Sequence, residues 1–198
     1  MADGTQEPAK RPYGRSRREL AEIAIRMFEE EGFAATTVEE IAQRAAYSPR
    51  TFFRQFPTKE DVVFFDLPDI LSPLEALIGA APEGGAWAAV RAIVIGNSAN
   101  WEAAGPDLAL RRTRMFHEEP LLYRRFLEYA NEWEAVIARV FATERATDPL
   151  TDTYAQLLAT TVVGACRTAF RLWLAVPERP LARHMEDTLE LIESGFSL

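Results

Sequence analysis

Residues 36–61 read TTVEEIAQRAAYSPRTFFRQFPTKED, and the helix signals packed into this stretch decide the fold. Thr37 and Glu40 have the T-x-x-E spacing of a capping box, in which each side chain satisfies a free backbone N–H group of the other residue. The pattern predicts a helix that begins at Val38. We expect this helix to be short and to end near residues 45–46, because another start signal follows directly.

The second start signal is Ser48-Pro49, which combines a preferred N-cap residue with proline at the first helical position. It predicts a helix over residues 49–55. Phe56-Pro57 ends this helix, because a residue that precedes proline avoids the helical conformation. Two short helices joined by a tight turn are the helix-turn-helix pattern.

Helical patterns continue on both sides of this stretch. Downstream, Thr58 is expected to cap a fourth helix over residues 59–67, whose apolar residues would connect two cores and serve as a hinge. Upstream, a helix is expected to end at Gly32, a common stop residue. The apolar residues of that upstream helix recur at helical spacing: Leu20, Ile23, Ala24, Met27 and Phe28.

Longer helices follow a segment rich in proline and glycine, residues 68–85. No part of the sequence shows the alternating pattern of a strand, so the predicted fold class is all-α. We expect a basic flexible arm (1–14), a three-helix helix-turn-helix domain (15–67) and a C-terminal helical bundle (68–198). The helices predicted for the bundle cover residues 87–101, 107–118, 120–141, 149–176 and 180–195.

Composition excludes several classes of protein. The chain has 198 residues, 48% of them hydrophobic, which rules out extended disorder and a collagen-like chain. Its single cysteine, Cys166, rules out an intrachain disulfide. Residues 1–10 lack the apolar region of a signal peptide, and arginines such as Arg91 and Arg167 interrupt the longest apolar runs. We therefore expect a cytoplasmic protein that does not enter a membrane.

The charge is unevenly distributed. The net charge of −8 argues against general coating of nucleic acid, yet residues 1–60 hold ten basic and ten acidic residues and are neutral. Residues 61–198 therefore carry the whole excess of negative charge. A basic segment near the N-terminus could meet a polyanion. Its members are Lys10, Arg11, Arg15, Arg17 and Arg18.

Residues 17–67 resemble the N-terminal domain of TetR-family transcriptional regulators. The resemblance rests on F-x-x-x-G-F from Phe28, TTVEEIA from Thr36, and A-x-x-S-x-R-T-x-F-R-x-F-P-T-K-E-D from Ala45, in unbroken order. It implies a regulator, most often a repressor, that binds a palindromic double-stranded DNA operator as a homodimer. It also implies that the helix over residues 49–55 reads the major groove.

The N-terminal end of a recognition helix normally meets the base edges, so Arg50 is placed to pair with a guanine. Arg54 could equally pair with an acidic neighbour. Thr37 and Lys59, at expected helix N-termini, are candidates for phosphate contacts. Phe53 stands where the family usually has tyrosine, so a hydroxyl contact to phosphate is lost. The full set of expected DNA contacts is Arg15, Arg17, Thr37, Tyr47, Ser48, Pro49, Arg50, Thr51, Phe53, Arg54, Gln55 and Lys59.

In the resembling family the last two long helices form the homodimer. The apolar faces of residues 149–176 and 180–195 are wide enough to serve both a core and a partner. Cys166 is expected to be a small buried residue of this region. The predicted dimer contacts are Leu158, Val162, Phe170, Trp173, Leu189, Ile192 and Phe196.

The family also binds small effectors inside its C-terminal bundle. Arg112–Leu121 partly fits a pattern of the mycofactocin-associated and acyl-CoA-responsive subgroup, which suggests an acyl-CoA-like effector anchored by arginine. An aromatic stripe at helical spacing is usually ordinary core. The predicted pocket residues are Trp87, Trp101, Arg112, Met115, Phe116, Tyr129, Trp133 and Phe170.

An enzyme is the rival class of function. The sequence contains no nucleotide-binding glycine motif, no zinc-protease helix motif and no nucleophile elbow. His117 and His184 are its only histidines, and no metal-binding cluster surrounds them. We therefore expect no catalytic residue, no metal and no cofactor. A regulator that binds DNA without any effector remains the alternative.

Overall fold

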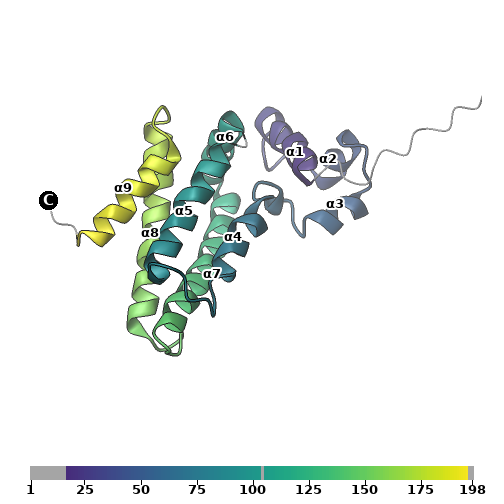
Figure 1. The fold of residues 1–198 in the computed structure, drawn as a ribbon. Coiled ribbons are helices and arrows are strands. Elements are labelled where there is room, and N and C mark those ends of the chain that lie inside the picture. Colours follow the sequence, from purple (N-terminus) through teal and green to yellow (C-terminus); the bar gives the residue numbers. More distant parts are fainter. Residues whose placement is uncertain (1–16, 104, 196–198) are drawn as a thin grey trace, which may run out of the picture. The chain divides into compact units, whose positions relative to one another are not determined.

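The fold is seen in a computed structural model that describes residues 17–103 and 105–195 (Figure 1). The predicted arm over residues 1–14, Arg15 and Phe196 lie outside the described residues. Every regular element in the described part is a helix, as predicted. The described residues form two units that divide between Phe65 and Asp66, two residues before the expected boundary. Asp66 belongs to the second unit because its carboxylate binds Arg112 there.

The first unit contains the three predicted helices, α1 (Arg17–Glu31), α2 (Val38–Arg44) and α3 (Pro49–Gln55). Both start signals form. Thr37 and Glu40 make the reciprocal capping box of α2. The hydroxyl oxygen of Ser48 accepts a hydrogen bond from the backbone N–H of Thr51 at 3.2 Å and caps α3. These contacts are local, which is why the sequence predicted them.

The core of the first unit is made by one face of each helix and by the segment after α3. From α3 it receives Phe52, whose ring lies 5.6 Å from the ring of Phe56. Both side chains are fully buried. The other large buried residues of the unit are Leu20, Ile25, Met27, Phe28, Phe33, Ile41, Val62, Val63, Phe64 and Phe65.

The prediction of a fourth helix over residues 59–67 is wrong. Only a single 3-10 turn forms there, over Glu60–Val62. Thr58 and Asp61 do make reciprocal bonds, but turns follow instead of a helix. Residues 62–65 are four consecutive buried side chains, and a helix would spread four consecutive side chains around its axis. A turn structure buries all four.

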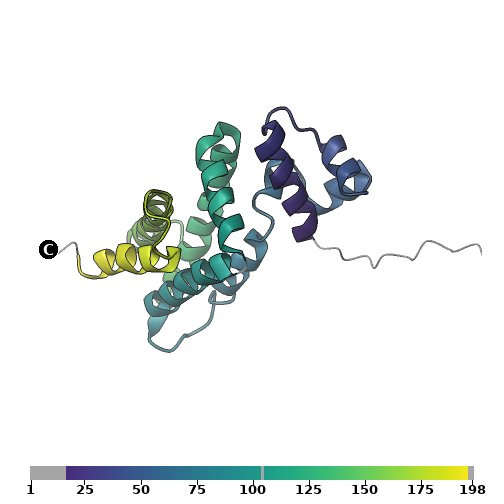
Figure 2. The ribbon, with the colours of Figure 1, turned by 90° about the horizontal axis from the view of Figure 1, so that it is seen from above.

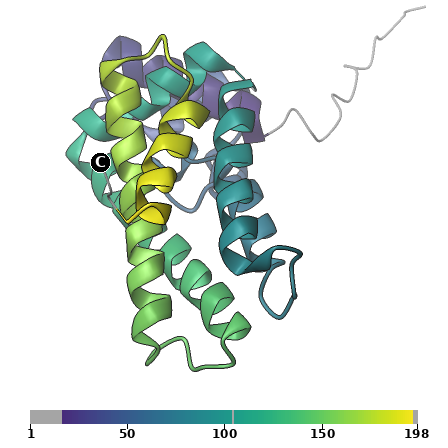
Figure 3. The ribbon, with the colours of Figure 1, turned by 60° about the vertical axis from the view of Figure 1, so that its left-hand side comes forward.

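The second unit is a bundle of longer helices. α8 packs against α7 on one side and α9 on the other, and α5 packs against α9 (Figure 3). Figure 2 views α8 nearly along its axis, with α9 beside it. The helices are α4 (Leu67–Glu75), α5 (Gly85–Ala103), α6 (Pro106–Glu118), α7 (Pro120–Glu144), α8 (Thr153–Ala175) and α9 (Leu181–Glu193).

α8 begins at Thr153, four residues later than the predicted start at residue 149. Its cap is Asp152, whose carboxylate accepts hydrogen bonds from the N–H groups of Tyr154 and Ala155. The hydroxyl of Thr147 and the guanidinium of Arg145 also donate to this carboxylate and hold its pKa at about 2. By length and composition alone, α8 is long and apolar enough to cross a membrane. This is weak evidence for a membrane span, because the core helices of soluble proteins pass the same test.

Candidate DNA-binding surface and ligand cavity

The start of α3 is open to solvent. Ser48, Pro49 and Arg50 are exposed, and Tyr47 and Thr51 are half-buried. The start of α3 is anchored by the Ser48 cap, so the backbone that carries Arg50 is held in place. The Arg50 guanidinium stands on a helix narrow enough to enter a major groove.

The adjacent side chains of Phe52 and Phe53 lie in opposite environments. Phe52 is fully buried, whereas Phe53 is 50% exposed, and their rings meet edge to face at 5.6 Å. Farther along α3, Arg54 is exposed and Gln55 is half-buried. α3 therefore has one face in the core and one face that carries the predicted contact residues.

Arg17 lies beside this helix at the start of α1. Its guanidinium carbon is 5.0 Å from the centre of the Phe56 ring, a cation–π arrangement. The side chain is only half-buried. Arg17 thus presents positive charge near the surface, while its guanidinium group packs on the buried ring of Phe56.

Two predicted phosphate contacts have other partners in the structure. Both the N–H and the hydroxyl of Thr37 donate to the Glu40 carboxylate, at 2.9 and 2.7 Å. These bonds lower the pKa of Glu40, so an anion already occupies the start of α2. The Lys59 ammonium donates to the backbone oxygens of Phe33 and Thr36, at 2.7 and 2.9 Å. It also lies 4.2 Å from the centre of the Phe33 ring.

We therefore predict that Lys59→Met lowers stability and leaves DNA electrostatics unchanged. Methionine keeps the stem but loses two bonds from a charged donor, so the free energy of unfolding should fall by about 2 kcal/mol. The measurements are urea unfolding and the salt dependence of DNA binding. A wild-type stability combined with a salt slope reduced by about 0.9 for each bound protomer would instead identify a phosphate contact.

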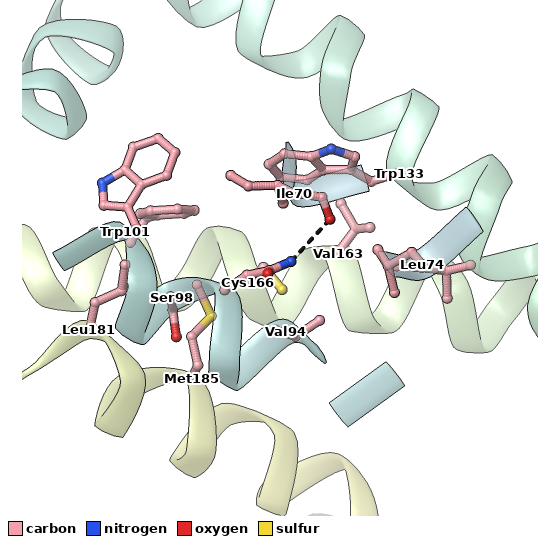
Figure 4. Close-up of a pocket in the computed structure, with 13 residues that line it drawn as sticks. Ile70, Leu74, Val94, Ser98, Trp101, Trp133, Val163, Cys166, Leu181 and Met185 are labelled. Carbon is pink, nitrogen blue, oxygen red and sulfur yellow. Dashed lines mark hydrogen bonds between the residues drawn. The ribbon is translucent and has the colours of Figure 1, made fainter. Parts of the chain in front are cut away.

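The second unit has a partly open cavity of about 60 Å³ between α4, α5, α7, α8 and α9 (Figure 4). Of the predicted pocket residues, the structure brings Trp101, Trp133 and Phe170 to its wall. Trp87, Met115, Phe116 and Tyr129 do not line it, and Phe116 is fully buried among other rings. The remaining lining residues are Ile70, Leu74, Val94, Asn97, Ser98, Ile137, Val163, Cys166, Leu181 and Met185.

Arg112 is not the ligand anchor that the sequence suggested. It is 3% exposed, and its two terminal nitrogens bind the two carboxylate oxygens of Asp66 at 2.8 and 2.5 Å. The guanidinium carbon also lies 4.2 Å from the centre of the Trp101 ring. The charge that was expected to meet an anionic ligand is therefore already neutralised by Asp66.

Sequence reasoning missed most of the wall because these residues come from five helices. Asn97 and Ser98 carried a usable signal: they are adjacent polar residues in an otherwise apolar part of α5. The Asn97 amide donates to the backbone oxygen of Ile70 at 3.0 Å. Burial raises the pKa of the Cys166 thiol to about 12, so the thiol is neutral. Among the described residues no group of three His, Cys, Asp or Glu could hold a metal ion.

Comparisons with known proteins identify both units. Residues 20–64 match the family described as "Bacterial regulatory proteins, tetR family". Residues 85–197, more than half of the chain, match the family described as "MftR C-terminal domain". The chain belongs to the TetR family. It is therefore a DNA-binding transcription regulator.

Two named relatives of this TetR-family regulator agree with the assignment. The HTH-type transcriptional regulator TcmR of Streptomyces glaucescens is 29% identical over 170 residues, which cover 83% of this chain and 75% of that protein. The putative mycofactocin biosynthesis transcriptional regulator MftR of Mycobacterium tuberculosis is 24% identical over 178 residues, 89% of each chain. Both are named as transcription regulators, not as enzymes.

Solved structures share the same architecture. FadR of Thermus thermophilus, a TetR-family repressor solved with lauroyl-CoA, is 26% identical with a TM-score of 0.59, over 92% of this chain and 96% of that one. SmeT of Stenotrophomonas maltophilia is 16% identical with a TM-score of 0.61, over 91% and 89% of the two chains. The likeness to SmeT concerns the fold alone.

The TetR-family regulator also has an open apolar face on α8 and α9. Of the predicted dimer contacts, Val162, Phe170, Trp173 and Leu189 are buried within the chain itself, so they do not lie on the exposed surface of α8 and α9. Leu158 and Ile192 are half-buried. The exposed large apolar residues of the two helices include Leu157, Leu172 and Leu191, at 66%, 43% and 42% exposure. A groove of about 480 Å³ that includes Gly164 and Ile192 runs along α8 and α9.

Proposed function

We propose that this regulator is a ligand-responsive repressor that binds a palindromic operator as a homodimer. The observation that carries the proposal is α3, whose buried Phe52 fixes the helix while its other face presents Arg50 to solvent. Two copies related by a two-fold axis would present two such helices to two half-sites about one helical turn apart.

The contact residues divide by the part of DNA that they would meet. Arg50 and Thr51 lie at the start of α3 and would face base edges, with Tyr47 and Ser48 beside them. Phe53 and Arg54 would lie against the sugar-phosphate backbone. Arg17 would approach a flanking phosphate. Thr37 and Lys59 leave this set because their polar groups are already bonded within the unit.

Arg50→Ala should relax sequence preference. A bidentate arginine–guanine pair contributes about 1–3 kcal/mol of discrimination. The homodimer would lose one pair in each half-site, so the free-energy difference between specific and non-specific binding should fall by about 2–6 kcal/mol. The matched control is Arg26→Ala, which removes an exposed arginine from α1 of the same unit. If both variants lose affinity equally on every DNA, Arg50 contributes only charge.

For the homodimer we propose the exposed face of α8 and α9. Leu157 and Leu172 lie on the same side of α8, with the small residues Gly164 and Ala165 between them. Small residues at that point allow close approach of a second helix, and the exposed leucines would then be covered. Sedimentation of the full chain measures the dimer directly.

For the effector we propose a molecule whose apolar part enters the cavity of the second unit. A long-chain acyl-CoA is the first candidate, supported by the lauroyl-CoA bound to FadR of T. thermophilus. The cavity of about 60 Å³ is far smaller than the roughly 300–1,000 Å³ of drug-sized sites, so binding must move the surrounding helices. This coupling is what a ligand-responsive repressor requires.

The test is fluorescence anisotropy with DNA from the region that flanks the gene of this regulator. A shuffled sequence and a salt series accompany it, because salt controls affinity for DNA. Tight binding that exceeds the shuffled control by about a thousandfold or more supports the proposal. Lauroyl-CoA is then added. Release of the DNA supports a ligand-responsive repressor, whereas unchanged binding favours a regulator without this effector.

A further inference from the structure

The wall of the cavity in the second unit carries no charge. None of the described residues that line it is acidic or basic, and its thiol, Cys166, is neutral. Arg112 stacks on the lining residue Trp101, but its charge is paired with Asp66. An isolated charge is costly in such surroundings. The part of any ligand that enters this cavity should therefore be uncharged.

The polar groups of the wall are mainly hydrogen-bond donors. The hydroxyl of Ser98 is already used, because it donates to the backbone oxygen of Ile95 at 2.7 Å. The indole N–H groups of Trp101 and Trp133 are buried and have no hydrogen-bond partner in the described part of the chain. The Asn97 amide has two N–H groups. One of them donates to the backbone oxygen of Ile70. The second N–H group of Asn97 could therefore donate to a ligand oxygen in a wall that is otherwise almost entirely apolar.

The bond between Asn97 and Ile70 joins α5 to α4, and both residues line the cavity (Figure 4). α4 depends on such outside bonds more than an ordinary helix does. Pro73 lies inside it and has no N–H to donate to the preceding turn. Asp66, at its N-cap position, makes no capping bond because its carboxylate binds Arg112. α4 is thus held from the side by two polar anchors.

We propose that Asn97 is the specificity residue of the cavity and that it recognises a carbonyl oxygen on an otherwise apolar ligand. The ligand carbonyl accepts a hydrogen bond from the second N–H group of Asn97, while the bond to the Ile70 oxygen anchors α4 and holds the amide in place. A ligand without the carbonyl fills the same space but leaves the second N–H group without this bond. The inference rests on the proposed effector site, but not on the identity of the operator.

The anchor is tested first without any ligand. Asn97→Leu keeps the size of the side chain and removes the bond to Ile70, so amides of α4 should exchange with deuterium about fivefold faster, the value of one ordinary hydrogen bond. Asn100→Leu is the matched control, since Asn100 is an exposed residue one turn further along α5. Equal exchange of α4 in wild type and Asn97→Leu overturns the proposed anchor.

The ligand preference is tested with acetophenone and ethylbenzene, which share a carbon skeleton and differ by the carbonyl oxygen. Both Kd values are measured by NMR titration on the wild type and on Asn97→Leu of the full chain. The wild type should favour acetophenone over ethylbenzene about tenfold more strongly than Asn97→Leu does. The reason is that the variant cannot donate the buried hydrogen bond to the carbonyl of acetophenone. The ratio of the two Kd values is compared between the wild type and Asn97→Leu. The difference in hydrophobicity between the probes is the same for both proteins and therefore cancels.

An unchanged ratio, or no binding of either probe to the wild type, overturns the assignment of Asn97. Anisotropy with operator DNA is measured on the same samples. A wild type that binds its operator but fails the probe test leaves the repressor in place and removes only the carbonyl-reading cavity. A wild type that fails on DNA overturns the proposed function independently of the probes.

Discussion

Asp66→Ala should lower the free energy of unfolding by about 3–5 kcal/mol, the usual effect of removing one partner from a buried ion pair. Arg112 is only 3% exposed, and in this variant its charge would remain buried without a carboxylate. The cost comes from that unpaired charge, not from the net value of the pair. The variant should also free the start of α4, whose N-cap position Asp66 occupies.

Urea unfolding at fixed protein concentration measures this effect. Asp69→Ala is the control, because Asp69 is an exposed acidic residue in the first turn of the same helix. The double variant Asp66→Leu/Arg112→Met should recover most of the loss, since apolar replacement of a whole buried pair is often neutral. A single variant as stable as wild type would mean that Arg112 finds water or another partner.

Phe52→Ala should unfold the first unit and abolish operator binding. Phe52 is fully buried and stacks near Phe56, and removal of such a ring costs about 3–5 kcal/mol. The first unit is small, so it has little stability in reserve. Phe53→Ala is the matched control on the adjacent residue. Because Phe53 is half exposed, its loss should leave stability nearly unchanged and affect only contacts to DNA.

The two units can be followed separately in this experiment. All four tryptophans, Trp87, Trp101, Trp133 and Trp173, belong to the second unit. Tryptophan fluorescence should therefore report an unchanged transition in Phe52→Ala, whereas circular dichroism should lose helical signal at a lower temperature. Simultaneous loss of both signals would show that the two units unfold as one.

Helix starts were predictable because the bonds that make them are local. Thr37 with Glu40 and Ser48 with Thr51 each lie three residues apart, so their spacing carries the whole interaction. The same rule failed after Thr58, although Thr58 and Asp61 form their local bonds. The burial of four consecutive side chains over residues 62–65 outweighed the local signal there.

The sequence by itself determined the all-α class, the limits of α2 and α3, and the exposed position of Arg50. Only the tertiary structure decided what Arg112 and Lys59 do. Arg112 meets a carboxylate 46 residues away, and Lys59 meets carbonyl oxygens 23 and 26 residues away. Likewise, helical spacing showed that α8 is apolar, but only packing against α7 and α9 showed which of its residues are covered. Periodicity identifies the apolar face of a helix, whereas the partner of a charge or a face depends on how distant segments pack.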